Sequence, residues 1–205
     1  MFAQEFSCPS CGAPVKQQNP GSKTLCCGYC GQTSHLLADS LRAVGEKHLL
    51  IDYGSMFETG MQGKFGGRDF LVLGRMRFDY EDGFWDEWYI NYLDDGSEGW
   101  IQEDDGSFVL FREEKRLDRP IDFPRMKVGA WSELDGAWQA TFITSKGRAT
   151  VNGGEGELPF QILPGEQVDF IDGIWKAQAL SVELMKYERV LFVGKPVEPE
   201  ELQLA

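Results

Sequence analysis

The chain has 205 residues, of which 42% are hydrophobic and 13% aromatic, and it carries a net charge of −13. This length can bury one good core and a small appended module. So acidic a chain repels phosphate backbones and anionic lipid surfaces, and no stretch approaches the ~18–20 apolar residues of a membrane span, so the composition argues against nucleic-acid binding and direct membrane insertion.

Four cysteines in two matched pairs open the chain. Cys8 and Cys11 form the first pair and Cys27 and Cys30 the second, with two residues between the thiols of each pair, a glycine directly after it, and 15 residues between the pairs. This spacing lets both sulfurs of a pair reach one ion from a tight turn, which the glycine closes with a positive φ. Four thiolates in a tetrahedral array are the ligand set of a structural zinc site. The sequence therefore predicts a zinc ribbon over residues 1–38, with zinc as the cofactor.

Alternatives to this ligand set are open at two points. Cys26 could be the third ligand in place of Cys27, although only Cys27 reproduces the spacing of the first pair. The thiols could also hold iron, or form disulfides or a redox pair, but all five cysteines cluster between positions 8 and 30, which is typical of intracellular metal binding. We therefore expect a cytoplasmic protein. Metal binding is expected to stabilise the folded ribbon by about 10 kcal/mol. His35 is expected at the surface.

A short helix is expected around the linker, residues 39–53. Asp39 could cap it. Apolar residues recur near helical spacing there, and they are Leu36, Leu37, Leu41, Val44 and Leu49.

From residue 54 to residue 195 the pattern is that of β-strands. Residues 70–80 alternate between two faces, and Asp82-Gly83 predicts a hairpin turn to a second strand over 85–93. Further strands are expected at 99–103, 107–112, 138–145, 147–151, 167–171, 175–180 and 187–193, and further Asp-Gly turns at 95–96, 105–106, 135–136 and 172–173. So many strands must curl or close to hide their edges. We expect a mainly β fold, in which an antiparallel barrel-like or sandwich-like body follows the ribbon.

A charged, proline-broken stretch at 113–127 divides this body. The parts on either side, 54–112 and 126–195, each hold a Gly-x-Trp element (Gly83 to Trp85, Gly173 to Trp175), which would suit two related β halves. The tail at 196–205 is expected to be loose.

Several short motifs occur in an order typical of one family. They are Gly74-Arg75, Trp85-Asp86-Glu87-Trp88, Gly99-Trp100-Ile101, Gly156-Glu157-Leu158-Pro159 and Phe170-Ile171-Asp172. With these motifs, roughly residues 50–195 resemble a bacterial family known as domain of unknown function 4178, whose members are often preceded by a zinc ribbon. The resemblance implies a β-rich cytosolic domain with no established catalytic activity, and it supplies no catalytic residues. It also implies a polyamine-synthesis or membrane-stress context, reached through protein partners.

The candidate binding surface of the body centres on the Trp-Asp-Glu-Trp motif. Its members are Trp85, Asp86, Glu87, Trp88, Trp100 and Glu157. On a strand, the adjacent Asp86 and Glu87 point to opposite faces and cannot form a catalytic pair with each other. An acid beside aromatic rings would have a raised pKa suited to acid–base chemistry. The alternative is an aromatic core in which one acid binds Arg75 or Arg77, with Glu157 in a hydrated turn.

Two classes of function are therefore expected. The first is a non-enzymatic, zinc-binding adaptor of the bacterial cytosol that docks a protein partner, because no catalytic constellation stands out. The second is a carboxylate-dependent hydrolase or lyase using Asp86, Glu87 or Glu157, which requires a deep pocket at one of these acids. Nucleic-acid binding by the ribbon is not expected, since Lys16 and Lys23 are its only nearby cations and the chain after residue 45 has 17 basic against 31 acidic side chains.

Overall fold

The computed structural model describes residues 4–117, 120–134, 140–186 and 189–204. Strands dominate this part of the chain and it contains no α-helix, which confirms the mainly β class. Within the same ranges, no helix has the length and apolar character needed to cross a membrane.

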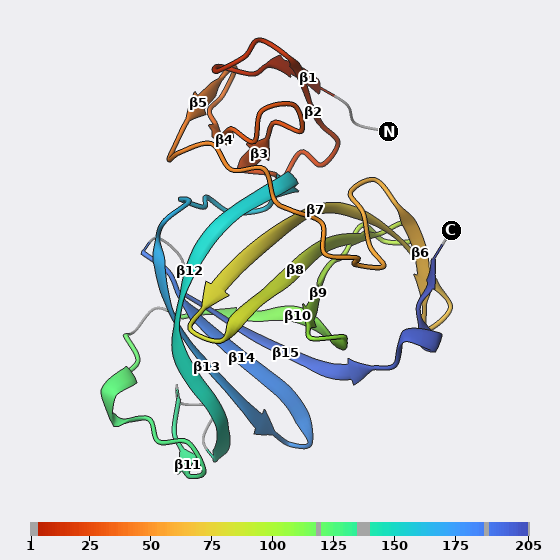
Figure 1. Ribbon diagram of the computed structural model, residues 1–205. Coiled ribbons are helices and arrows are strands. Elements are labelled where there is room, and N and C mark those ends of the chain that lie inside the picture. The colour runs from red at the N-terminus through yellow and green to blue at the C-terminus, as the bar shows by residue number, and fades with distance from the viewer. Residues whose placement is uncertain (1–3, 118–119, 135–139, 187–188, 205) are drawn as a thin grey trace.

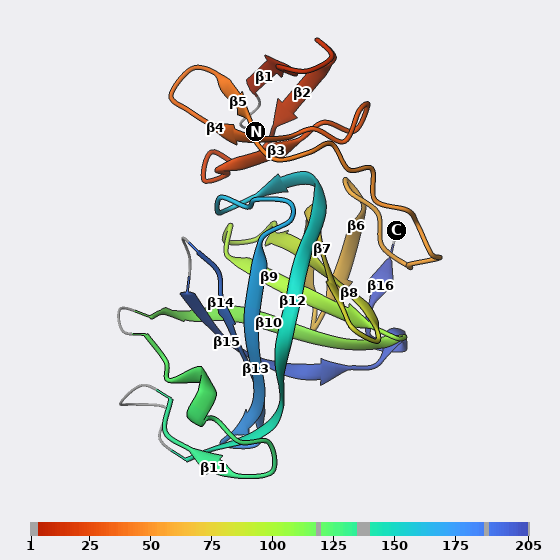
Figure 2. The same cartoon turned by 60° about the vertical axis from the view of Figure 1, so that its left-hand side comes forward.

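Eight antiparallel strands form a closed barrel (Figures 1 and 2). They are β7 (Arg68–Tyr80), β8 (Gly83–Tyr92), β9 (Glu98–Asp104), β10 (Ser107–Arg116), β12 (Thr141–Leu158), β13 (Gln167–Trp175), β14 (Gln178–Leu184) and β15 (Arg189–Val197). Neighbours follow the order β7–β8–β9–β10–β15–β14–β13–β12, and β12 then pairs with β7. Of the two expected forms the chain adopts the barrel, which leaves no edge among these strands. Residues 54–112 and 126–195 contribute four barrel strands each.

Alternation along each strand divides its side chains between the barrel interior and an outer layer. On β8, Trp85 and Tyr89 belong to the inner apolar core, whereas Trp88 and Ile90 belong to a second core on the outer face. Both faces are apolar because both are covered. This explains why the strand reads as nearly continuous aromatic and aliphatic sequence.

Closure of the barrel depends on glycines where β7 meets β12. The register of β7 against β8 shifts between Val72 and Gly74, and that of β12 against β7 shifts between Val151 and Gly153, and such irregularities increase the bend and twist of a strand. Gly156 has a φ of +66°, and a Cβ there would lie 2.2 Å from the carbonyl oxygen of Leu73. Only glycine combines that backbone conformation with so close an approach.

Two segments cover the outside of the barrel. Phe57 and β6 (Gln62–Phe65) pack over Trp88 and Ile101 together with the end of the chain. The 3₁₀ turn η3 (Pro199–Glu201) follows β15, and β16 (Gln203–Leu204) then pairs with β6. The tail is therefore not loose, because Leu202 is buried in this outer core.

The second cover lies over β13, β14 and β15. It consists of Leu117 and residues 120–134, with the 3₁₀ turn η1 (Phe123–Arg125) and β11 (Trp131–Ser132), which pairs with β12. The proline-broken stretch thus connects the two sets of strands and also buries apolar surface.

Five short strands form the N-terminal module at one end of the barrel (Figure 1). They are β1 (Gln4–Ser7), β2 (Pro14–Gln17), β3 (Thr24–Cys26), β4 (Thr33–Leu36) and β5 (Leu41–Ala43). The helix expected around the linker is wrong, because residues 36–43 form a hairpin in which β5 pairs with β4. The Leu37 N–H donates to the Ser40 carbonyl at 2.9 Å and closes its turn.

One of the expected Asp-Gly turns is also wrong. Asp172 and Gly173 lie within β13, and the hairpin turn follows at Lys176 and Ala177, which have φ of 47° and 62°. Gly173 is needed for a different reason, since a Cβ there would lie 2.7 Å from the carbonyl oxygen of Phe142 on β12. The Asp-Gly turn expected at 135–136 lies outside the described residues.

Candidate functional site

The two cysteine pairs of the N-terminal module form turns with the same hydrogen bonds. The N–H of Gly12 donates to the Cys8 carbonyl at 2.9 Å, and the N–H of Gly31 donates to the Cys27 carbonyl at 2.8 Å. Gly12 and Gly31 have φ of 77° and 69°. Glycine is favoured at both positions because this conformation strains other residues.

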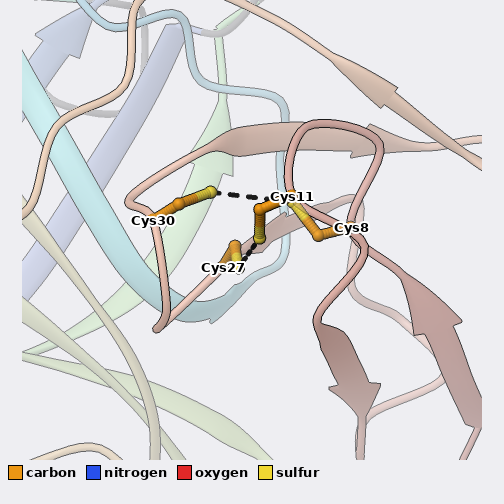
Figure 3. A group of neighbouring side chains, drawn as sticks. All are labelled: Cys8, Cys11, Cys27 and Cys30. Atoms are coloured by element: carbon orange, nitrogen blue, oxygen red, sulfur yellow. Dashed lines mark hydrogen bonds between the residues drawn. The ribbon is translucent and has the colours of Figure 1, made fainter.

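These turns bring four sulfurs together (Figure 3). The Sγ atoms of Cys8, Cys11, Cys27 and Cys30 all lie within 4.8 Å of one another. Cys8 and Cys30 are 3.8 Å apart and Cys11 and Cys27 are 3.7 Å apart. A tetrahedron with metal–sulfur bonds of about 2.3 Å has edges of about 3.8 Å. The sulfur cage therefore has the dimensions of a four-thiolate metal site.

Backbone donors favour the thiolate form of Cys8, whereas burial raises the pKa of Cys27 and of Cys30 in the same cage. Burial raises the pKa of the Cys8 thiol, but the N–H groups of Cys11 and Ser10 that point at its sulfur outweigh burial and lower the pKa to about 7. The Ser10 nitrogen lies 3.4 Å from that sulfur. Since a metal binds the thiolate, these donors make the group a better ligand.

The two other candidates near the cage point elsewhere. Cys26 is buried against Gly154 of β12 and lies 3.8 Å from the Thr33 hydroxyl, and burial raises the pKa of its thiol to about 12. The Nε2 of His35 lies 2.8 Å from the Ile162 carbonyl. Cys26 therefore packs as a neutral thiol, and His35 links the module to the loop after β12.

Glu157 holds the cysteine module against the barrel. It is 2% exposed and accepts hydrogen bonds from the N–H of Gln18 at 2.6 Å, the N–H of Asn19 at 3.0 Å and the hydroxyl of Ser22 at 2.8 Å. The last residues of β12, Glu157 and Leu158, also pair with β3. The expectation of a hydrated turn here is therefore wrong, because the acid is a buried clamp.

Asp86 lies on the outer face of β8 in a buried ion-pair network. Its carboxylate accepts from Nε and Nη2 of Arg77 at 2.8 and 2.6 Å and lies 3.4 Å from Nη1 of Arg75. The guanidinium groups also lie over rings, that of Arg75 over Trp88 and that of Arg77 over Phe84. This is the structural alternative that the sequence offered for one of the two adjacent acids.

The expected binding surface does not form. Its three tryptophans, Trp85, Trp88 and Trp100, are at most 5% exposed, and they divide between the inner and outer cores. Strand alternation sends the neighbours of the Trp-Asp-Glu-Trp motif to opposite sides of the barrel wall. The motif is therefore core.

Glu87 instead lines a cavity of about 140 Å³ inside the barrel. Its carboxyl group hydrogen-bonds to that of Glu183 on β14, the strand opposite β8, and accepts from the Trp85 indole N–H at 3.1 Å. Burial raises the pKa of Glu87, and burial followed by repulsion from Glu87 raises the pKa of Glu183 well above its usual range. Two acids in such contact share a proton.

Two more acids line the same cavity. Burial raises the pKa of Asp172 to about 6, with smaller effects from the charges of Glu87 and Asp104, and burial raises the pKa of Asp104 itself. Asp104, Asp172 and Glu183 are not among the site residues predicted from the sequence. The available signal was an acid in the inward register of an otherwise apolar strand, as in Gln178–Leu184, where Ser181 and Glu183 alternate with Leu180 and Val182.

A family model described as a domain of unknown function, DUF4178, matches residues 58–199. The matched range contains the whole barrel and ends after β15. No curated protein matches the chain, and no solved structure matches it.

Proposed function

The chain belongs to the DUF4178 family of domains of unknown function, and on that premise we propose that it is a non-enzymatic, zinc-binding interaction protein of the cytoplasm. Four sulfurs at tetrahedral spacing support zinc as the ion, because four thiolates in a closed site are its usual structural ligand set. The ion's role is structural, since a module of this size has too small a core to fold alone.

The observation that carries the interaction role is an exposed apolar strap, defined here as residues 49–53. Leu49, Ile51 and Tyr53 are 62%, 62% and 65% exposed, while Leu50 between them is buried. The strap runs from the second cysteine turn, where the His48 N–H donates to the Gly31 carbonyl, to the barrel, where the Tyr53 ring packs at a tilt against Phe84 with centroids 5.0 Å apart. Alternating exposed apolar side chains on a fixed segment are typical of a protein-docking site.

Charge indicates the chemistry of the partner. The chain carries a net −13, so a docking segment with apolar side chains flanked by lysine or arginine would complement the strap and its surroundings. Tyr29 on the second cysteine turn, 83% exposed, extends the available ring surface. In this proposal zinc fixes the turn against which the strap lies.

The carboxylate-dependent hydrolase or lyase has less support. Asp86 lines a cavity of about 500 Å³, but its carboxylate is committed to Arg77, and Glu157 is committed to the cysteine module. Of the three acids, this leaves Glu87 as the one that lines a cavity without an arginine partner. Hydrolysis of an ester or amide builds negative charge in the transition state. The cavity offers several acids and no lysine, arginine or histidine among its described lining residues, so it would oppose that charge.

Co-purification of a strap variant tests the interaction role. The double variant Leu49→Ser/Ile51→Ser and the control Leu93→Ser, which removes an apolar residue 51% exposed elsewhere, would be used as zinc-loaded baits beside the unaltered protein. We expect one protein to be retained by the unaltered chain and the control but lost from the double variant. The proposal fails if all three baits retain the same proteins or none, provided that zinc content and melting temperature are unchanged.

A further inference from the structure

The barrel interior contains an acidic cavity with an outlet. The cavity around Glu87 shares Tyr80, Gln102, Asp104 and Asp172 with a second cavity of about 730 Å³. That second cavity reaches exposed residues of the hairpin turns, including Asp105 and Ala177. Because β13 runs from the loop beside the cysteine module to this turn, the outlet lies at the barrel end away from that module.

One carboxyl oxygen in the cavity has no partner. Glu183 is 2% exposed, and its Oε2 makes no hydrogen bond. A buried acceptor left without a donor is costly, and here the other acids make the surroundings still less favourable for charge. Neither cavity has a lysine, arginine or histidine among its described lining residues. The donor that satisfies this oxygen is therefore a water molecule or a ligand that carries N–H or O–H groups.

The arrangement does not fit a metal ion. In the part of the chain that the structure describes, only the four cysteines bring ligand atoms close enough together to hold one. The acids of the cavity line a space of about 140 Å³, which suits a larger cation. Trp85 and Phe170 line the same space, and their ring centroids lie 5.2 Å apart. Carboxylates and ring faces together attract an ammonium group, which offers several N–H donors.

We propose that the barrel interior binds the ammonium group of a small organic amine, with Glu183 and Asp172 as acceptors and Trp85 and Phe170 as an apolar wall. The amine reaches the cavity past Asp104. The two acceptors lie on neighbouring strands, β14 and β13, while Glu87 reaches the same space from the opposite wall. This site is separate from the strap and from the sulfur cage, so it stands or falls independently of the interaction role.

Nuclear magnetic resonance of the zinc-loaded full chain tests the site. The Trp85 indole N–H, which donates to Glu87, is the reporter signal. Three probes are compared at matched ionic strength: n-butylammonium chloride, 1-butanol of the same chain length, and calcium chloride. We expect a saturable shift of this signal with n-butylammonium alone. An equal response to 1-butanol, a response to calcium only, or no response to n-butylammonium overturns the proposal.

Matched variants place the binding at the acids. Glu183→Gln and Asp172→Asn should each lower the affinity for n-butylammonium about tenfold or more, since an amide, unlike the carboxyl group it replaces, cannot release a proton to solvent and become the anion that pairs with the ammonium group. Asp169→Asn is the control, because Asp169 lies on the same strand as Asp172 but pairs with Arg148 at 2.7 Å on the outer side. If Asp169→Asn weakens binding as much as the two cavity variants do, the interior site is refuted. Asp172→Asn carries the comparison if Glu183→Gln does not fold.

Discussion

Replacing Asp86 by asparagine should destabilise the barrel strongly while leaving its shape unchanged. The carboxylate binds Arg77 through two contacts of 2.8 and 2.6 Å, and Arg75 and Arg77 are 3% and 4% exposed. Asparagine keeps one acceptor, turns an N–H₂ group toward a guanidinium donor, and leaves two buried cations without their shared anion. Breaking a buried ion pair from one side costs about 3–5 kcal/mol. For a chain of this length, each kcal/mol lowers the melting temperature by about 2–4 °C, so the expected decrease is roughly 6–20 °C.

Thermal unfolding followed by near-ultraviolet circular dichroism measures this effect, because the buried tryptophans report on barrel packing. Asp82→Asn is the matched control, since Asp82 is exposed in the turn between β7 and β8 and should change stability by less than about 0.5 kcal/mol. The double variant Arg77→Met/Asp86→Leu should recover much of the loss, because an apolar replacement removes charges on both sides. A melting temperature for Asp86→Asn equal to that of Asp82→Asn would refute the buried-pair reasoning.

Three further predictions concern the metal, the cavity and the barrel seam. Cys11→Ser should abolish stoichiometric zinc binding, measured by elemental analysis of the purified chain, whereas Cys26→Ala should retain the metal. Burial raises the pKa of Glu183 well above 4.5, so the stability that this group contributes is present at low pH and lost as the pH rises through the native pKa. Between about pH 5 and pH 8, Glu183→Gln should therefore lose less stability than the unaltered chain. Chemical unfolding at saturating zinc measures this difference. Gly156→Ala should destabilise the barrel by more than about 1 kcal/mol, because its Cβ would lie 2.2 Å from a backbone oxygen, and by more than Gly129→Ala, whose Cβ would meet nothing within 4 Å.

Of the candidate site, the four cysteine ligands of the sulfur cage were the part most readily predicted from the sequence. Its chemistry needs particular residues at short spacing, and both turns repeat the same local pattern from Cys8 and from Cys27. Strand positions were also predictable, since alternation along residues 70–80 is a local signal. Closure was not, because it depends on pairing residues 150–156 of β12 with residues 74–79 of β7, far apart in the chain.

The sequence-based predictions that proved wrong or incomplete have a common physical origin. Leucines near helical spacing around residue 41 suggested a helix, but pairing of β5 with β4 decided the structure. Asp172-Gly173 has the composition of a turn, yet the glycine is there because β12 approaches closely. Alternation likewise showed that Asp86 and Glu87 face opposite ways, but it could not show that Glu87 meets Glu183 from the far wall. Contacts between residues far apart in the chain thus determine the roles of these side chains, and a local sequence pattern does not reveal such contacts.

Strand β12 extends beyond the barrel, and the cysteine module pairs with its protruding end. Its final residues, Glu157 and Leu158, pair with β3 of the cysteine module, and the Thr24 hydroxyl of β3 donates to the Phe160 carbonyl at 2.8 Å. If zinc is withdrawn and that module unravels, an unpaired run of backbone donors and acceptors appears beside exposed apolar side chains. Such an edge adds readily to a copy of itself. In the zinc-bound protein proposed above, pairing of β12 with β3 therefore also guards against self-association.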